Sequence, residues 1–425
     1  MDTEAKAKVA VIGAGIVGLT TALQLQRAGL SVVLLDAQGP GSGCSRGNAG
    51  HFATEQVFPL ASIAVLRQLP AMLLDPTGPL RLRAGYFFKA LPWLLRFVAN
   101  VRPSRQQALQ RALSVLNAQA LPAWQRLLPQ AEATDLVQFR GALLVSEQPG
   151  LIDLAQTFRQ YKEAGISVKW LEQAALRARE PALSSQVQGA IEFPEVAHTV
   201  DPYALCLQLY QQFVALGGQF RQQQVQRIRP CSNGYQLDLV PEPNIPQSGP
   251  GELALQASQL VICAGAASHR LCADLGYQVP LEAERGYHLM TQSRPLQSPV
   301  SSLERKFIMT PMQHGLRLAG TVEFAGINSA PDYRRASVLL QHANQLLAEP
   351  TSANPAQEPW AGNRPSLPDS LPVLGAAPRH PGVYLNFGHQ HLGLTWAALT
   401  AEITGALLLR QTLELDLSPY RIDRF

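Results

Sequence analysis

The chain has 425 residues, of which 46% are hydrophobic and 16% are charged. This length is typical of two domains with sizeable cores, because single domains commonly hold about 100–200 residues. The net charge of +4, from 35 basic and 31 acidic residues, is too small and too scattered to indicate a nucleic-acid partner.

Five cysteines are spread over the chain without a CxxC pair. An odd number at wide spacing argues against a disulfide framework and against a zinc site, and it favours a reducing compartment. The first apolar strand begins at Val9, which leaves no room for a signal peptide, and no run of about twenty apolar residues occurs. We therefore expect a cytoplasmic protein without a bound metal ion.

The most informative segment is residues 9–36, VAVIGAGIVGLTTALQLQRAGLSVVLLD. It predicts a strand, a glycine-rich turn, a helix, a second strand and a closing acid, which is the order of a dinucleotide-binding βαβ unit. In such a unit Gly13 allows the tight turn, Gly15 lets the backbone approach a pyrophosphate, and Gly18 allows the helix to pack closely on the strand. The positive helix end faces the phosphates, and Asp36 accepts hydrogen bonds from the ribose hydroxyls.

A polar, glycine-rich stretch follows at 39–50. From about 60 to 130 the pattern is helical and lacks strand signals. Leucines and Trp124 at helical spacing predict a long amphipathic helix over 105–128.

Asp201 followed by Pro202 predicts a helix N-terminus, and that helix extends to Gly217-Gly218. A proline-rich loop is predicted at 241–251, and a Pro/Ser-rich connection carries Arg364. The other predicted strands cover 141–146, 189–193, 219–229, 234–240, 260–263, 283–292, 305–311, 316–322 and 383–387, and the other helices cover 151–164, 333–348, 394–410 and a segment after 264–267.

Three further segments carry a resemblance to a known family. Residues 44–50 (CSRGNAG) are similar to a second flavin loop, and residues 261–266 (VICAGA) to a strand-to-helix return. The most specific block runs from Arg364-Pro365 through 372–375 (PVLG) to 387–395 (FGHQHLGLT). With these segments the chain resembles the D-amino-acid-oxidase-like superfamily of FAD-dependent amine oxidoreductases. The nearest pattern is that of bacterial D-amino-acid dehydrogenases acting on D-proline or cis-4-hydroxy-D-proline.

The resemblance covers nearly the whole chain and implies an α/β fold in two parts. A discontinuous Rossmann-type FAD-binding domain would comprise residues 1–60, 198–275 and 360–425. A second α/β domain, built on a mixed sheet, would bind the substrate and comprise residues 61–197 and 276–359.

The same resemblance implies non-covalent FAD. A helix beginning at 392–395 would aim its N–H groups at the flavin N1/C2=O locus, where reduction places negative charge. Some related oxidases attach FAD through a cysteine shortly before this turn, and no cysteine lies between Cys272 and Phe425. The expected cofactor-binding residues are Gly13, Gly15, Ile16, Val17, Gly18, Asp36, Ser45, Asn48, Ala49, Gly50, Val225, Ala264, Gly265, Gly388, Leu392, Gly393, Leu394 and Thr395.

The substrate site is expected around Arg364, because residues 362–365 match a GxRP-like element whose arginine holds the substrate carboxylate in the family. A guanidinium binds a carboxylate through two parallel hydrogen bonds, which a lysine does poorly. The alternative is an arginine that ties down a proline-rich loop. Strand alternation puts Arg285 and Tyr287 on one face and His288 on the other. Tyr287 is expected to reach the carboxylate or the amine, unless it only packs in the sheet.

Histidines supply the expected proton acceptors. His51 follows the second flavin loop, and His389 and His391 flank the C-terminal turn. Each either touches flavin or substrate or has a structural role. The motifs at 47–51 and 389–395 contain no Asp or Glu, so we expect no carboxylate beside the substrate amine.

These features predict the oxidative dehydrogenation of a D-amino acid or cyclic imino acid, with a hydride passing from Cα to flavin N5. The lysine that sarcosine oxidases place near the flavin has no clear counterpart. We therefore expect electrons to pass to a quinone or another respiratory-chain component, and the alternative is a glycine- or sarcosine-type oxidase using O₂. A tRNA-modifying flavoprotein is disfavoured by the charge balance, and a catalytically silent FAD-binding protein by Arg364 and the C-terminal turn.

Residues 80–103 mix Arg and Lys with Phe, Trp and Leu. Basic amphipathic helices bind anionic membranes, and such contact would place the protein on the inner face of the cell membrane. Pro92 interrupts the pattern, and the alternative is a core or lid helix.

Overall fold

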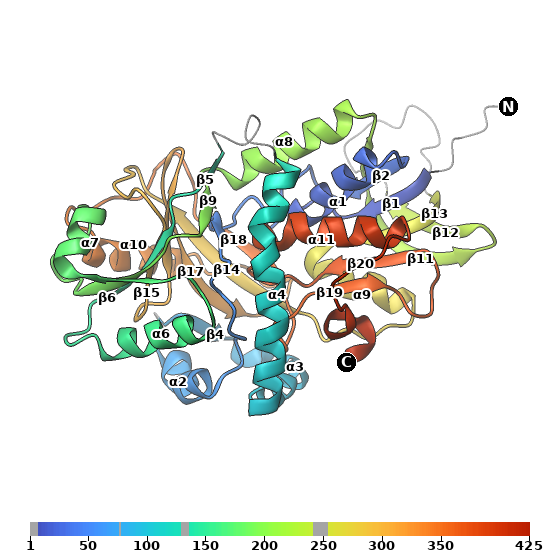
Figure 1. Cartoon of the computed structure of the whole chain (residues 1–425). Coiled ribbons are helices and arrows are strands. Elements are labelled where there is room, and N and C mark those ends of the chain that lie inside the picture. Colours follow the sequence, from blue (N-terminus) through green and yellow to red (C-terminus); the bar gives the residue numbers. More distant parts are fainter. Residues whose placement is uncertain (1–6, 76–77, 129–135, 241–253) are drawn as a thin grey trace.

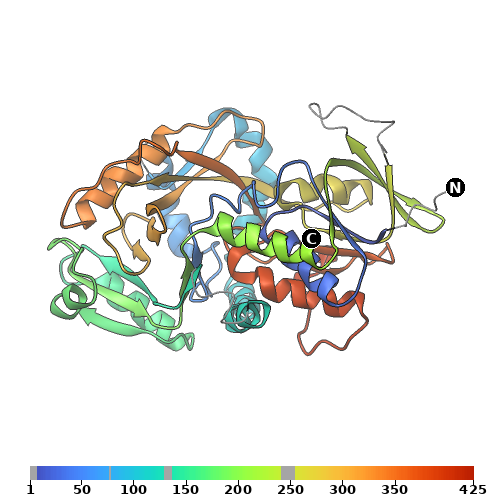
Figure 2. The ribbon, with the colours of Figure 1, turned by 90° about the horizontal axis from the view of Figure 1, so that it is seen from above.

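The computed structural model describes residues 7–75, 78–128, 136–240 and 254–425. Two large sheets lie side by side, the first at the right of Figure 1 and the second at the left. Helix α4 (Pro103–Leu127) stands between them in this view, and Figure 2 shows it nearly end-on. The predicted α/β class with a mixed second sheet is confirmed. The predicted loop at 241–251 lies outside the described residues.

The first sheet contains the N-terminal βαβ unit. Its central strands pair in parallel, β1 with β2 and β13, and β13 with β20. Their nearly continuous apolar sequences suit strands that are covered on both faces. The strands are β10 (Gln219–Gln222), β2 (Val32–Asp36), β1 (Ala7–Ile12), β13 (Ala254–Ile262), β12 (Gly234–Val240) and β11 (Gln224–Cys231) in spatial order, with β20 (Val383–Phe387) beside β13 and β19 (Val373–Ala376) beside β20.

Helices cover both faces of the first sheet. One face packs against α1 (Ile16–Arg27), α8 (Pro202–Ala215), α11 (Gly393–Leu408) and, through α11, α4. The other face packs against α9 (Ser268–Asp274). Two helix predictions are confirmed: α4 buries Leu113, Leu116 and Trp124, and the Asp201 carboxylate caps α8 by accepting two backbone N–H bonds.

The second sheet is mixed, because β4 pairs in parallel with β17 and β15 with β6, whereas the other pairs are antiparallel. Helix α10 (Arg334–Leu346) packs on β14 and β17. The strands are β18 (Trp360–Ser366), β14 (Glu282–Met290), β17 (Gly315–Phe324), β16 (Ile308–Met312), β15 (Val300–Ser302), β6 (Ala142–Ser146), β8 (Gly189–Phe193) and β7 (Lys169–Glu172), with β4 (Leu80–Leu82) beside β17.

A small third sheet has the order β3 (His51–Phe52), β9 (Ala197–Thr199) and β5 (Val137–Gln138). The remaining described elements are α2 (Ile63–Leu74), α3 (Phe87–Ala99), α6 (Ile152–Glu163), α7 (Gln173–Arg179) and the 3₁₀ helices η1 (Ala84–Tyr86), η2 (Gly265–Ala267), η3 (Ser418–Tyr420) and η4 (Ile422–Arg424).

Residues 360–366 correct the sequence prediction of a Pro/Ser-rich connection. They form β18, which pairs along its length with β14 at the edge of the second sheet. An edge position tolerates Pro365, because that strand has one side without ladder hydrogen bonds. The chain therefore leaves the second sheet after Ser366, whereas the predicted division assigned everything from residue 360 onward to the first domain.

Two other strand predictions were wrong in detail. The region 60–130 contains β4, whose three residues are held by pairing with β17 rather than by a pattern of their own. The single strand predicted over 219–229 is divided into β10, which pairs in parallel with β2, and β11, which pairs antiparallel with β12. A change of pairing partner leaves no mark in hydrophobic periodicity.

The glycine-rich turn has the predicted geometry. Gly13 has a φ of +107°, and a Cβ there would lie 2.4 Å from the Cys263 carbonyl oxygen. A Cβ on Gly18 would lie 1.7 Å from the Gly13 carbonyl oxygen. Backbone therefore approaches backbone at the two positions where only glycine leaves enough space.

Replacing Gly18 with alanine is expected to lower the thermal unfolding midpoint sharply. The new methyl group meets a backbone carbonyl rather than a movable side chain, so the cost lies at or above the upper end of the roughly 1–3 kcal/mol of core overpacking. Gly85→Ala is the matched control, because no atom lies within 4 Å of the methyl position there. Equal midpoints for the two variants would contradict this account of the turn.

Candidate active site

A cavity of about 1050 Å³ lies where the carboxyl ends of β1 and β13 meet β14 and β18 of the second sheet. In open parallel sheets, ligands bind outside the carboxyl ends of the strands. Most of the expected cofactor-binding residues come together in its wall: Gly13, Gly15, Ile16, Val17, Asp36, Ser45, Asn48, Ala49, Val225, Ala264, Gly265, Gly388, Gly393 and Leu394.

Four of the expected residues support this wall from behind. Gly18 gives α1 its close packing, and Gly50 (φ +76°) lies tightly against the Thr199 carbonyl group. Leu392 is the buried N-cap residue of α11. The Thr395 hydroxyl accepts a hydrogen bond from the Ala53 N–H at 3.0 Å and so joins α11 to the chain after β3.

The cavity offers what an elongated, anionic dinucleotide requires. Helices α1 and α11 begin at its wall, and neither first turn contains an acidic side chain, so both positive helix ends are free to face phosphate or a reduced flavin. Three wall atoms (Asn363 Oδ1, Asn386 Oδ1 and Gln390 Oε1) are buried and have no hydrogen-bond partner within the described chain. These three atoms are shielded from the cavity, so the groups that fit FAD are the two helix ends and Asp36, which line it.

Asp36 closes β2 and is already engaged by the backbone. Its carboxylate accepts hydrogen bonds from the Ala14 N–H at 2.6 Å and the Gln38 N–H at 2.8 Å. Burial raises the pKa of this carboxyl, against the lowering effect of the two N–H donors. A carboxylate has about four lone-pair sites, so about two remain for a ribose.

The loop at 44–50, which is expected to contact the flavin, is fixed to both halves of the molecule. The Ser45 hydroxyl accepts a hydrogen bond from the Ile16 N–H at 2.8 Å, at the start of α1. From the second sheet, the guanidinium of Arg317 donates to the carbonyl groups of Arg46 and Asn48. No sequence pattern singles out Arg317, because only the pairing of β14 with β17 brings it to this loop.

Arg364 lies in the cavity wall on β18, opposite Glu284 of β14. Its Nη1 atom donates to the Glu284 carboxylate at 3.1 Å, and the Ser366 hydroxyl donates to the same carboxylate at 3.2 Å. A Cβ on Gly286 would lie 2.4 Å from Arg364 Nη2, so glycine at this position provides the space that the guanidinium occupies. The side chain of Arg364 is 24% exposed and that of Glu284 only 9%.

The sequence did not single out Glu284, whose carboxylate lies in the cavity wall beside Arg364. It lies at the end of the site expected to bind the substrate carboxylate, so the expectation of no carboxylate beside the amine stays a prediction. The signal was available: Glu284, Gly286 and His288 alternate on the face of β14 opposite Tyr287. The glycine in that row marks a close approach of another group, here the guanidinium of Arg364.

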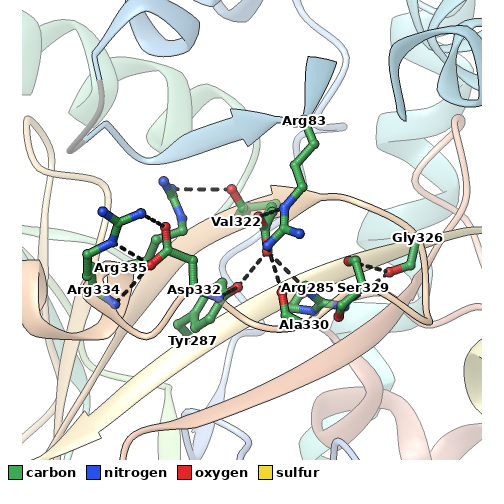
Figure 3. A network of polar contacts seen from close by, with 11 residues as sticks. Arg83, Arg285, Tyr287, Val322, Gly326, Ser329, Ala330, Asp332, Arg334 and Arg335 are labelled. Carbon is green, nitrogen blue, oxygen red and sulfur yellow. Dashed lines mark hydrogen bonds and ion pairs between the residues drawn. The ribbon is translucent and has the colours of Figure 1, made fainter. Parts of the chain in front are cut away.

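Tyr287 does not lie among the residues that line the cavity. It is 1% exposed, donates to the Glu323 carboxylate at 2.6 Å and accepts from the Asp332 N–H at 3.0 Å. Figure 3 shows it within a polar network with Arg285 and Asp332. The Tyr287 ring belongs to the same buried apolar cluster as Ala336 and Leu339 of α10. The expectation that it touches substrate is corrected: alternation paired Tyr287 with Arg285 as predicted, but that face packs inside the domain.

Trp360 forms an aromatic part of the cavity wall. Its ring stacks on His288 with a centroid distance of 5.1 Å, and a Cβ on either Gly47 or Gly362 would overlap the ring. His288 also contacts the Gly47 carbonyl oxygen through Nδ1 at 3.1 Å. The loop glycine and the strand glycine thus both leave space for one tryptophan that joins the two halves.

All three candidate histidines line the cavity. His51 contacts the Glu55 carboxylate through Nε2 at 2.8 Å, and both side chains are buried. Burial lowers the pKa of His389 to about 3 and that of His391 to about 4. His389 contacts the Thr400 hydroxyl and His391 the Gln56 side-chain oxygen. Of the three, only His51 has a carboxylate as its ring partner.

Residues 8–407 match a family model described as FAD dependent oxidoreductase, DAO. A D-amino-acid oxidase of Bradyrhizobium diazoefficiens is 33% identical over 427 residues, covering 98% of this chain and 98% of the relative. A D-amino acid dehydrogenase 2 of Ralstonia nicotianae is 29% identical and covers 98% of this chain and 100% of the relative.

Solved structures give the same fold. Glycine oxidase from Geobacillus kaustophilus has a TM-score of 0.75 at 21% identity, covering 99% of this chain and 100% of that chain. L-proline dehydrogenase from P. horikoshii has a TM-score of 0.74 at 16% identity, covering 99% and 98%. At such identities the likeness supports the arrangement of the elements alone.

Proposed function

The chain belongs to the DAO family of FAD-dependent oxidoreductases and is a FAD-dependent amino acid oxidoreductase, and from this premise we propose that it dehydrogenates a D-amino acid or cyclic imino acid and passes the electrons to a quinone-type acceptor. The D configuration is supported by the names of relatives that match over 98% of the chain, one an oxidase and one a dehydrogenase of D-amino acids.

The observation that carries the proposal is the position of Arg364. Its guanidinium lies in the wall of the cavity that the FAD-binding residues line, on a strand rather than a loop, with Glu284 fixing one nitrogen. The remaining N–H groups can bind a substrate carboxylate and set its orientation. FAD, when bound, supplies the hydride acceptor. The protein then has to bind the carboxylate, expose the Cα–H bond and accept a proton from the substrate ammonium.

An anaerobic screen of D- and L-amino acids, including cyclic imino acids, tests the proposed function. The purified flavoprotein is mixed with each compound and its flavin absorbance is followed. We expect bleaching by one or more D-amino acids or cyclic imino acids. Bleaching by L-amino acids alone, or by no amino acid in the panel, would contradict the proposal.

We expect the FAD to be non-covalently bound. Of the cysteines, Cys44 and Cys263 line the cavity, but burial raises the pKa of the first thiol to about 11 and of the second to about 12. Both stay protonated at neutral pH, and a thiolate is the reactive form of cysteine. Denaturation in acid should therefore release all of the flavin into the supernatant as FAD, and flavin precipitating with the chain would contradict this expectation.

Reduced enzyme is expected to react slowly with O₂ and rapidly with a quinone or an artificial dye. Lys306 is the one lysine among the residues lining the cavity, but its side chain is exposed. The carboxylates near it, Glu304 and Asp153, are not among the residues expected to bind FAD, so Lys306 lies away from the expected flavin site. Stopped-flow reoxidation by air and by a soluble quinone measures both rates. Stoichiometric H₂O₂ at the rate of turnover would establish the oxidase alternative, which the name of the 33% identical relative favours.

The membrane interpretation of residues 80–103 stays a prediction. Helix α3 buries Ala90 and Trp93 but leaves Phe88 82% and Leu95 63% exposed, and its exposed side also carries Lys89 and Arg96. Among the described helices, none is long and apolar enough to cross a bilayer. Sedimentation with anionic vesicles, compared with neutral ones, tests peripheral contact, and a Phe88→Ser variant should lose any binding that this face provides.

A further inference from the structure

We propose that His51 and His198 form a proton path from the cavity to solvent. The path reaches solvent at Gln138, on the edge of the small sheet. The proposal rests on the proposed function, because it assigns a route to the proton that an amino acid must lose before its Cα hydride can leave.

The three side chains form a row across the small sheet. His51 of β3 pairs directly with His198 of β9, and His198 pairs directly with Gln138 of β5, both in antiparallel register. Directly opposed residues of antiparallel strands point to the same face with Cβ atoms about 4.5–5.5 Å apart. The row begins at the cavity, which His51 lines, and ends at a half-buried residue followed by exposed Phe139.

The buried part of this row contains polar atoms without hydrogen-bond partners among the described residues. His198 is 0% exposed, and neither of its ring nitrogens has a hydrogen-bond partner in the described part of the chain. The same holds for His51 Nδ1 and for Glu55 Oε2. Buried polar atoms in folded proteins are almost always paired, with ordered water where the protein supplies no partner. Four such atoms lie around one pair of strands, so donors and acceptors are available along the row for a proton to pass by small movements of the side chains or through an inserted water molecule.

The contact between His51 and Glu55 fixes which nitrogen is free. An ionised carboxylate only accepts hydrogen bonds, so the proton of a neutral His51 ring lies on Nε2, at 2.8 Å from Glu55 Oε1. Nδ1 is then the acceptor. In the proposed step an N–H bond of the substrate ammonium breaks, its electron pair stays on the substrate nitrogen, and the proton reaches Nδ1 through water, because Nδ1 itself is shielded from the cavity. FAD, when bound, would accept the hydride that the neutral amine then allows to leave Cα.

The charges around His51 and His198 favour passing the proton on toward solvent rather than holding it on His198. His51 is faced by Glu55, His391 and His198, and Arg140 and Arg294 lie near enough to act on His198. Burial, helped by these positive groups, lowers the pKa of His198 to about 3. His198 therefore stays neutral and passes a proton on by accepting at one nitrogen while releasing from the other.

Proton release during a single anaerobic turnover tests the path. Flavoprotein is mixed with a bleaching substrate in weak buffer containing a pH indicator, and both absorbances are followed by stopped flow. In the unmodified protein we expect one proton per flavin, appearing with the bleaching. In His198→Leu, and in Gln138→Leu should the first variant fold poorly, we expect proton release at least tenfold slower than bleaching, with FAD content unchanged. His342→Leu, which removes a half-buried histidine outside the cavity, should behave like the unmodified protein.

Proton release that keeps pace with bleaching in both row variants would overturn the path. Failure of every amino acid to bleach the flavin would instead count against the proposed function. A high-resolution crystal structure decides the path independently of turnover: ordered water bridging His51 Nδ1 and His198 supports it, and a dry space between them overturns it.

Discussion

Replacing Arg364 with alanine is expected to lower kcat/KM by at least two orders of magnitude, mainly through a higher KM. The loss corresponds to about 3–5 kcal/mol, the usual cost of removing one partner of a desolvated charge pair. Arg364 lies in the cavity wall, only partly exposed, so water cannot replace its hydrogen bonds to a substrate carboxylate. Arg364→Lys should recover little of the activity, because an ammonium lacks the planar pair of donors.

The neighbouring carboxylate has to be separated from this effect. Arg364→Ala alone leaves Glu284 buried without its cationic partner, which by itself disturbs the site. The double variant Arg364→Ala with Glu284→Gln removes that charge, and it should keep the high KM if Arg364 binds substrate. Arg126→Ala, which breaks an exposed pair with Glu402, is the control for losing an arginine elsewhere. Near-normal steady-state constants in the alanine and lysine variants would limit Arg364 to tying β18 to β14.

Local chemistry made the first sheet predictable from sequence. Three features each depend on one short segment alone, and all three are present in the structure. They are the glycine spacing in residues 9–36, the Asp201 cap and the uninterrupted apolar strands. The position of α4 followed in the same way from its helical spacing. Most of the residues expected to bind the cofactor line one cavity, because they are consecutive with those turns.

What could not be predicted depends on contacts between distant segments. β18 contains Gly362 and Pro365, and its sequence gives no strand signal until β14 pairs with it. That pairing is what brings Glu284 to Arg364 and turns Tyr287 away from the cavity. Likewise, His51 and His198 are 147 positions apart by their numbers, and only the register of a three-stranded sheet brings them together. Strand alternation correctly predicted which residues of β14 share a face, but it did not predict which of the two faces lines the cavity.

The value of kcat/KM is expected to rise with pH between about 6 and 10, by up to tenfold per pH unit below the controlling pKa, through one dominant ionisation. A substrate ammonium has no lone pair with which to expel a hydride, so catalysis requires its deprotonation. His389 and His391 do not account for the rise: burial lowers the pKa of these groups to about 3 and about 4, so both are neutral throughout this range. The other origins are the substrate amine itself and a proton acceptor other than these two histidines, for which we propose His51 because its ring contacts the Glu55 carboxylate.

Replacing His51 with glutamine distinguishes these two origins while keeping a polar side chain beside Glu55. Rates measured over pH 6–10 should rise less steeply in His51→Gln than in the unmodified protein, and the FAD content should be unchanged. His391→Gln is the matched control, because its ring is already neutral and its loss should leave the position of the rise where it was. An unchanged profile in His51→Gln would assign the rise to the substrate amine. A flat profile in the unmodified protein would show that no proton acceptor in the cavity limits the reaction, and the role given to His51 would then be wrong.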